Sequence, residues 1–130
     1  MTYRLSLYKD EIAPQASINL PAEDSIRAIY VVSGGLRVRS ENFGGVLGSN
    51  SGFHTSVAAQ LAAGHLATVA LRWHLARAGT PDACAPGNGV ISTKLLDAPM
   101  SLNAAQNYLL RCDRVDFPPG GEALTHTHRG

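Results

Sequence analysis

The chain has 130 residues, of which 45% are hydrophobic, and a formal net charge of +1; this is the size and composition of one globular domain of about 100–150 residues. Its 11 Lys and Arg residues are scattered, so no basic patch predicts binding to nucleic acid or to an anionic membrane. No apolar run reaches the roughly 18 residues of a membrane span, and charges interrupt the start where a signal peptide would be apolar, so we expect a cytoplasmic protein.

The first strong pattern covers residues 27–39. Residues 27–33 are β-branched, aromatic and apolar on both faces, which predicts a buried strand. Gly34 and Gly35 follow, and residues 36–39 alternate apolar and basic, as a half-exposed strand does. Two strands separated by a glycine pair predict a hairpin.

A second strand is predicted for residues 65–75. Its odd positions carry an apolar face that includes Trp73, which we expect in the core. Its even positions carry polar groups, among them Arg72 and His74. The alanines leave a helix open as the alternative, and residues 57–61 before it fit either a strand or a helical turn.

Glycine and proline punctuate the second half of the chain. Residues 79–89 form the best linker candidate, and residues 90–96 continue as an apolar-rich stretch. Ser101 is a candidate cap for a helical turn over 102–106, and residues 107–117 are a candidate long strand. Cys84 and Cys112 differ in setting and are expected to be free thiols in the cytoplasm. Many short strands with such punctuation predict an all-β barrel or sandwich.

Two histidines near the C-terminus carry the clearest chemical signal. His126 and His128 follow Gly120 and Gly121 after a predicted strand. Side chains at i and i+2 of a strand point to the same face, so these two imidazoles can bind one metal ion together. The competing interpretation is a polar tail at a chain end, without a ligand role.

Residues 112–130, with their strand, Pro-Pro-Gly-Gly turn and His-x-His, resemble the opening of the first metal motif of a cupin. Cupins are antiparallel β-barrels of the jelly-roll kind. Residues 29–39 resemble the strand, glycine turn and strand of a second, degenerate copy. The chain thus looks like the front part of a two-domain cupin (a bicupin). The expected divisions are an N-terminal arm (1–15), a degenerate cupin barrel (16–80), a linker (81–97), and the start of an incomplete second barrel (98–130).

The resemblance implies that the first barrel has no metal. Its glutamate position falls on Arg27, and the histidine positions fall within residues 20–23, where no histidine is present. In the second copy, His126 and His128 would be metal ligands, and the remaining ligands would lie beyond Gly130. The implied cofactor is a divalent transition metal, with Fe, Mn, Ni, Zn and Cu all open.

The resemblance implies a small-molecule metalloenzyme such as a dioxygenase, with the 130-residue chain alone expected to be inactive. The alternative is a non-catalytic cupin that binds a small ligand or has a structural role. The expected partners are a small molecule and, through exposed strands, a second copy in a homodimer.

The remaining polar residues receive structural interpretations. Glu23 is expected at the surface, and Arg27 in a rim ion pair rather than at an anionic ligand; Arg72 is open between the same alternatives. The other three histidines, His54, His65 and His74, are expected to be surface or hydrogen-bonded residues rather than ligands.

Overall fold

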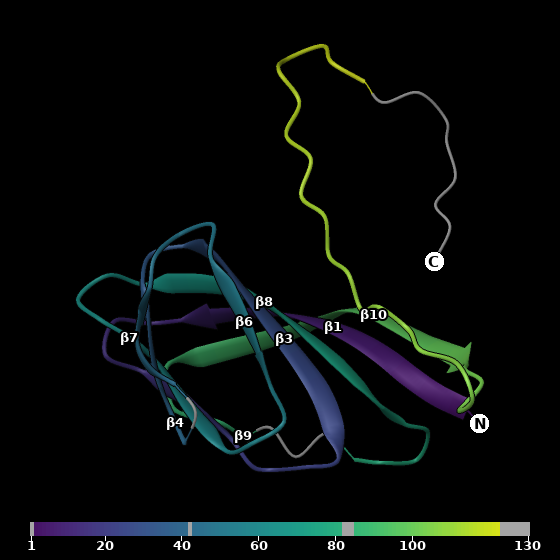
Figure 1. Ribbon diagram of the computed structural model, residues 1–130. Helices are drawn as coiled ribbons and strands as arrows, with labels where there is room; N and C mark the ends of the chain where they lie inside the picture. The colour runs from purple at the N-terminus through teal and green to yellow at the C-terminus, as the bar shows by residue number, and fades with distance from the viewer. Residues whose placement is uncertain (1, 42, 82–84, 123–130) are drawn as a thin grey trace.

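The computed structural model describes residues 2–41, 43–81 and 85–122 (Figure 1). These residues fold into two five-stranded antiparallel sheets, and they contain no helix. The expected all-β class is therefore confirmed, as two stacked sheets. None of the described residues belongs to a helix that is long and apolar enough to cross a membrane.

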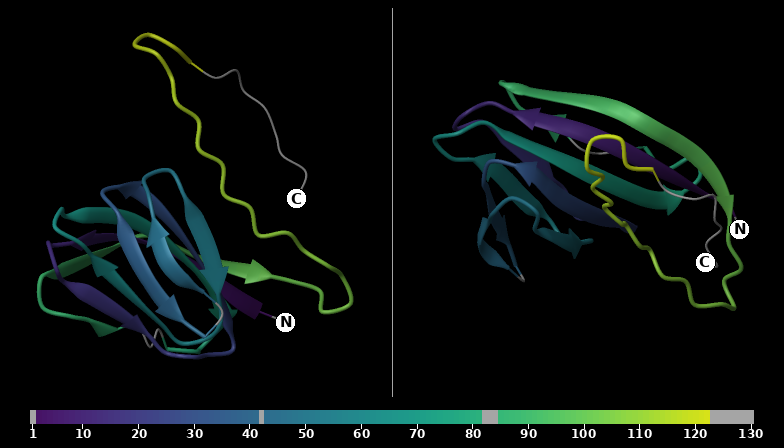
Figure 2. Two further views of the ribbon diagram at one scale, coloured as in Figure 1. Left: turned by 60° about the vertical axis from the view of Figure 1, so that its left-hand side comes forward. Right: turned by 90° about the horizontal axis from the view of Figure 1, so that it is seen from above.

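Sheet A has the strand order β10-β1-β8-β3-β6, and sheet B has the order β5-β4-β7-β2-β9. Figure 2 shows the long strands of sheet A lying side by side. The strands of sheet A are β1 (Thr2–Ile12), β3 (Ser25–Ser33), β6 (Gly52–Thr55), β8 (Thr68–Arg77) and β10 (Val90–Ser101). Those of sheet B are β2 (Ser17–Leu20), β4 (Leu36–Ser40), β5 (Gly44–Leu47), β7 (Ala59–Ala63) and β9 (Ala85–Pro86).

The chain passes repeatedly from one sheet to the other. β1, β3, β6 and β8 belong to sheet A, whereas β2, β4, β5 and β7 belong to sheet B. Between β1 and β8, only the step from β4 to β5 joins neighbouring strands of one sheet. Most partners are consequently distant in sequence, as in the pairing of β1 with β8.

The predicted hairpin at residues 27–39 is wrong, because its two strands lie in different sheets. β3 pairs with β6 and β8, whereas β4 pairs with β5 and β7. Gly34 makes the corner between the sheets with a positive φ of 75°, which favours glycine. A side chain at this position would overlap the carbonyl oxygen of Ala67. Glycine is needed here to pass between layers, not to close a two-residue turn.

The apolar core lies between the two sheets. Alternating residues of β2, β4 and β7 in sheet B pack against parts of β1, β3 and β8 in sheet A, as the period of two in a strand requires. Burying each large aliphatic side chain stabilises the fold by about 1.5–3 kcal/mol. The buried members are Ile12, Ile18, Leu20, Ile29, Val31, Leu36, Val38, Ala59, Leu61, Ala63 and Ala70.

Strand β8 is confirmed, but its two faces are used in the opposite way to the expectation. The polar face is buried between the sheets: Arg72 is 1% exposed and His74 is 4% exposed. Trp73, expected in the core, is half-buried on the outer face of sheet A. This inversion is tolerated because the buried polar groups find charged and hydrogen-bonding partners inside the sandwich.

Other segments resolve the alternatives left by the sequence. The ambiguous residues 57–61 contribute to strand β7, not to a helix. Residues 102–106 form a turn, in which Gln106 N donates to Asn103 O at 3.0 Å, instead of a helical turn. The predicted strand at 107–117 is not formed; this part of the chain is extended and pairs with neither sheet. It continues from the end of β10 outside the two sheets (Figure 1).

Sheet A contains strands from the expected arm, the expected barrel and the expected linker. β1, within the expected arm, lies between β8 and β10. β10, most of it within the expected linker, pairs with β1 along its whole length, with one bulge beside Leu7 and Tyr8. The first and last strands therefore belong to the same sheet as the strands between them, a long-range pairing that local sequence patterns do not reveal.

Candidate functional site

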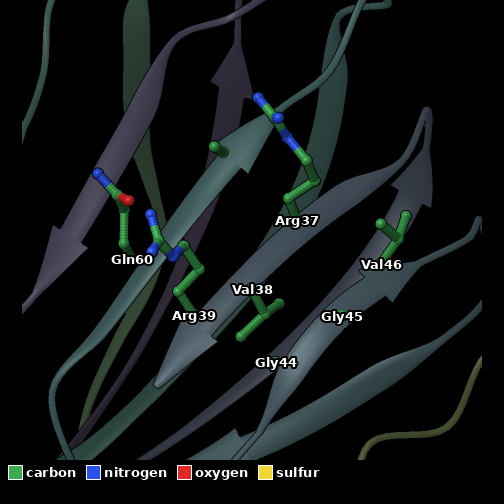
Figure 3. Close-up of a pocket in the computed structure, with 8 residues that line it drawn as sticks. Arg37, Val38, Arg39, Gly44, Gly45, Val46 and Gln60 are labelled. Atoms are coloured by element: carbon green, nitrogen blue, oxygen red, sulfur yellow. The ribbon is translucent and has the colours of Figure 1, made fainter. Parts of the chain in front are cut away.

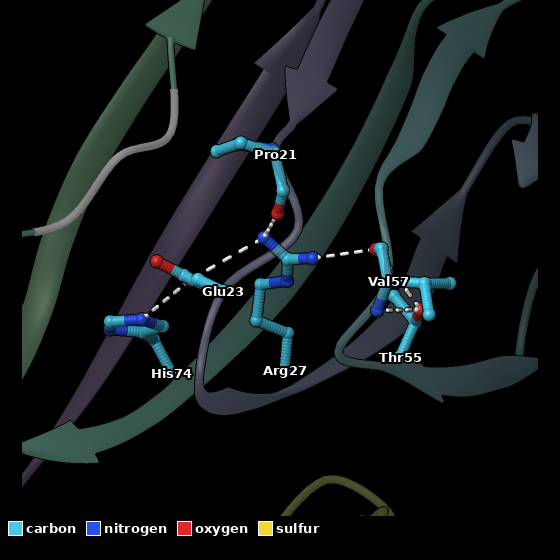
Figure 4. Close-up of polar contacts among 6 residues, drawn as sticks. All are labelled: Pro21, Glu23, Arg27, Thr55, Val57 and His74. Carbon is cyan, nitrogen blue, oxygen red and sulfur yellow. Dashed lines mark hydrogen bonds and ion pairs between the residues drawn. The ribbon is translucent and has the colours of Figure 1, made fainter.

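One group of polar side chains lies at an end of the sandwich, around Arg27 of β3 (Figure 4). Arg27 NH1 donates to the carbonyl oxygen of Pro21 at 2.6 Å, and NH2 donates to that of Val57 at 2.8 Å. NH1 also lies 3.4 Å from Glu23 Oε1. His74 of β8 lies 2.9 Å from the same carboxylate oxygen, which fits an Nε2–H donor.

This Arg27–Glu23–His74 cluster corrects two expectations. Arg27 is 1% exposed, so it is not at the rim, and the Glu23 side chain is 11% exposed, so it is not a surface carboxylate. His74 was expected to be either a surface residue or a hydrogen-bonded one, and it is hydrogen-bonded. Because Pro21 and Val57 lie in different loops, the cluster fastens both loops to β3.

A second buried cluster joins three neighbouring strands of sheet A. Arg72 Nε of β8 donates to Asp10 Oδ2 of β1 at 2.8 Å, and Arg72 NH2 lies 3.3 Å from Oδ1. The Ser92 hydroxyl of β10 donates to Asp10 Oδ1 at 2.5 Å. The Arg72 guanidinium also lies 4.4 Å from the ring centre of Tyr8, a cation–π distance. This arrangement satisfies a buried carboxylate with a two-point ion pair and a hydroxyl.

The Arg27–Glu23–His74 cluster is an unfavourable place for a metal ion. It offers one carboxylate and one imidazole, and the carboxylate lies 3.4 Å from the Arg27 guanidinium. Like charges about 4 Å apart repel by about 4 kcal/mol in a partly buried setting. In the part of the chain that the structure describes, no three His, Cys, Asp or Glu side chains form a metal-binding group.

A shallow groove of about 360 Å³ crosses the outer face of sheet B (Figure 3). Arg37 and Arg39 alternate with Val38 along β4, so both arginines project to this face. Gln60 of β7 lines the same groove. Arg37 lies 3.3 Å from both Gln15 Oε1 and Ala63 O. The two guanidiniums and the amide supply the kind of donors that bind an anion.

A cavity of about 490 Å³ lies between the outer face of sheet A and the segment that follows β10. Trp73 and Tyr30 line it from the sheet, and Leu109 and Leu110 line it from the segment. Arg114 NH1 donates to the Tyr30 hydroxyl at 2.7 Å, which holds the extended segment against β3.

His126 and His128, the expected metal ligands, lie outside the described residues, as does Cys84. The ligand role of these histidines and the expectation of two free thiols therefore stay predictions; Cys112 is an exposed free thiol. His54 and His65 are both exposed, and His65 Nδ1 lies 3.4 Å from Gln15 Nε2.

The sequence did not single out Asp10. Its local pattern, a charged residue among other charged residues near the N-terminus, is typical of a surface position. The sequence does contain a signal in β8, where Arg72 and His74 share a face with Thr68 and the other residues before Arg77 are apolar. A buried arginine requires an anionic partner, but the sequence does not indicate which carboxylate supplies it.

No family model, curated protein or solved structure matches this chain. The resemblance to cupins rests on residues 29–39 and 112–130.

Proposed function

We propose that the chain is part of a metal-binding protein of the cupin type, in which the two-sheet domain is metal-free and His126 and His128 bind the metal. The order of the strands supports this proposal. β1, β8, β3 and β6 are neighbours in sheet A, and β2, β7, β4 and β5 are neighbours in sheet B. Eight strands that wind between two antiparallel sheets are compatible with the double-sheet jelly roll of cupins, and this supports the proposal.

The contacts of Arg27 are the main support for a two-sheet domain without a metal. The resemblance places Arg27 where a metal-binding cupin has its glutamate. In the structure, its terminal nitrogens bind the Pro21 and Val57 carbonyl oxygens and face Glu23. A buried guanidinium held in this way stabilises the loops and disfavours a cation beside it. Metal binding is therefore assigned to His126 and His128, whose residue type suits Fe, Mn, Ni, Zn or Cu.

Metal content by elemental analysis tests this function. In a chain extended past Gly130 by the remaining ligands, we expect about one divalent metal per chain, lost in a His126→Ala/His128→Ala variant. A His54→Ala/His65→Ala variant is the matched control, because it also removes two imidazoles and both of its sites are exposed. Equal metal in all three extended proteins, or none in the extended chain without substitutions, would overturn the proposal.

The activity proposed for the metal centre is that of a small-molecule metalloenzyme, with dioxygen-dependent cleavage as the first reaction to assay. An open coordination position on such a metal admits oxygen, water or substrate. Oxygen consumption on diketone and aromatic substrates, compared between the metal-loaded extended protein and its His126→Ala/His128→Ala variant, tests the enzymatic part separately from metal binding.

A non-catalytic, ligand-binding role is the second candidate, and the groove on sheet B favours it. Arg39 and Gln60 border this groove and an adjoining one of about 500 Å³. Two guanidiniums at one groove suit a small anion. If this role is correct, phosphate or a dicarboxylate raises the thermal midpoint of the unaltered chain but not that of an Arg37→Gln/Arg39→Gln variant.

A further inference from the structure

The cavity of about 490 Å³ on the outer face of sheet A has small residues in its floor and larger ones around them. In the register of the sheet, Trp73 of β8, Ala28 of β3 and His54 of β6 lie side by side in one row. Tyr30 and Gly52 are paired in the next row on the same face. Because Ala28 and Gly52 fill little space, the rings of Trp73, Tyr30 and His54 surround a hollow.

Tyr30 is fixed at the wall of this cavity. Its hydroxyl donates to Asn50 Oδ1 and accepts a hydrogen bond of 2.7 Å from Arg114 NH1. The ring is therefore held in place before any molecule enters, which lowers the entropic cost of binding. Aromatic side chains pair with other rings in stacked or edge-to-face contacts. A wall of such rings suits a planar aromatic molecule.

The segment after β10 covers this cavity only in part. Leu109 and Leu110 line it from that side, yet Leu109 is 83% exposed and Leu110 is 36% exposed. Ile26, which lines the cavity from β3, is 49% exposed. A molecule between the sheet and the segment would bury this apolar surface, which is favourable in proportion to the area removed from water.

The lining is uncharged, and His54 gives it a polar group. Within the described part of the chain, no Asp, Glu, Lys or Arg side chain lines the cavity. His54 has no hydrogen-bond partner among the same described residues, and an imidazole can donate or accept. The cavity volume lies within the range of about 300–1,000 Å³ for small-molecule sites, which are mostly apolar with a few polar groups.

We propose that this cavity binds an uncharged planar aromatic molecule with one hydrogen-bonding group, such as a phenol or a neutral heteroaromatic compound. The ring of the ligand contacts Trp73 and Tyr30 beneath Leu110, and its polar group bonds the His54 imidazole. The site lies on the outer face of sheet A, on the other side of the sheet from the buried Asp10–Arg72 pair. The inference does not rest on metal binding.

Calorimetric titration with indole tests the proposal. We expect saturable binding of indole and no binding of cyclohexanol, which is uncharged but not planar. Ala28→Leu fills the floor of the cavity and is expected to weaken indole binding by more than about tenfold, since pockets reject one excess methylene by this order. Ala98→Leu is the matched control, because Ala98 is half-buried on the same face of sheet A, in β10, outside the cavity.

The hydrogen bond to His54 has its own test. His54→Phe keeps a ring at the wall and removes the nitrogens. This variant is expected to weaken indole binding by about two- to tenfold, the value of one hydrogen bond. Its affinity for indene, which has the same fused rings without the nitrogen, is expected to stay unchanged. Equal losses for indole and indene would overturn the role of His54.

Protection of Cys112 needs no substitution inside the cavity. Cys112 is an exposed free thiol that lines the cavity, and Cys84 is the other cysteine of the chain. In a Cys84→Ser protein, saturating indole is expected to slow the reaction of Cys112 with iodoacetamide, and cyclohexanol is not. The proposal is overturned by an unchanged Cys112 rate with indole, by the absence of saturable indole binding, or by a folded Ala28→Leu protein that binds indole as tightly as Ala98→Leu.

Discussion

Asp10 and Arg72 form a two-point ion pair inside the sandwich, with Arg72 Nε 2.8 Å from Asp10 Oδ2 and both side chains almost completely buried. The pair joins β1 to β8, and Ser92 extends it to β10. The interior of sheet A is therefore organised by charge as well as by apolar packing. The residues on either side of Arg72 along β8, Leu71 and Trp73, face the outer side of sheet A.

Removal of one member of this pair is expected to be strongly destabilising. Arg72→Met leaves the Asp10 carboxylate buried with Ser92 as its remaining partner of the cluster, and such losses cost about 3–5 kcal/mol. The double variant Asp10→Leu/Arg72→Met removes both charges and is expected to recover much of that stability. Urea unfolding of the two proteins and the unaltered chain measures the difference. Equal stability of the single and double variants would contradict a tightly coupled pair.

Arg27→Met is expected to loosen the end of the sandwich. It removes the donors for the Pro21 and Val57 carbonyl oxygens and leaves Glu23 without its cation. We expect a loss of about 2–4 kcal/mol in the free energy of unfolding. Arg39→Met is the control, because Arg39 is exposed on β4, and its effect should stay within about 0.5 kcal/mol. Similar effects of the two substitutions would show that Arg27 does not hold the loops.

Gly34→Ala tests the corner between the sheets. The methyl group would meet the Ala67 carbonyl oxygen in a backbone conformation that favours glycine, so a loss of more than about 1 kcal/mol is expected. Gly44→Ala is the matched control in β5, where a methyl group meets open space. Thermal unfolding compares the two variants. A Gly34→Ala protein as stable as the control would mean that the chain does not turn there as described.

The contact between β1 and β10 is expected to weaken in acid. Arg4 Nε donates to Asp97 Oδ1 at 2.5 Å, and this hydrogen bond lowers the pKa of Asp97 below its ordinary value of 3.8. A carboxyl with a lowered folded-state pKa stabilises the fold above the unfolded pKa, and this contribution is lost as the pH falls through the folded value. The effect is small because both side chains are exposed.

Asp97→Asn provides the measurement of this pH dependence. The difference in thermal midpoint between the unaltered chain and Asp97→Asn should be constant near neutral pH and shrink as the pH falls below about 3.8. A difference that grows on acidification would have the wrong sign for a lowered pKa.

The sequence was sufficient for the class of the fold and for several strands, because β-branched runs and glycine punctuation act locally. It was not sufficient for the sheet in which each strand lies. Gly34 and Gly35 fit a hairpin turn and a corner between sheets equally well, and only distant partners decide between them. The two faces of strand β8 were predicted the wrong way round, because its apolar face was expected to point into the core. The ion pair of Arg72 with Asp10, 62 positions apart in sequence, reverses that choice.

The position at which a metal binds distinguishes the histidines of this chain. Among the five histidines of the chain, His126 and His128 are the proposed ligands, whereas His74 is committed to Glu23. Addition of Mn²⁺ to the labelled protein broadens the NMR signals of nearby imidazoles. We expect broadening of the His126 and His128 signals, assigned with single His→Ala variants, while the His74 signal stays sharp. Broadening of His74 first, or no selective broadening at any histidine, would contradict this expectation.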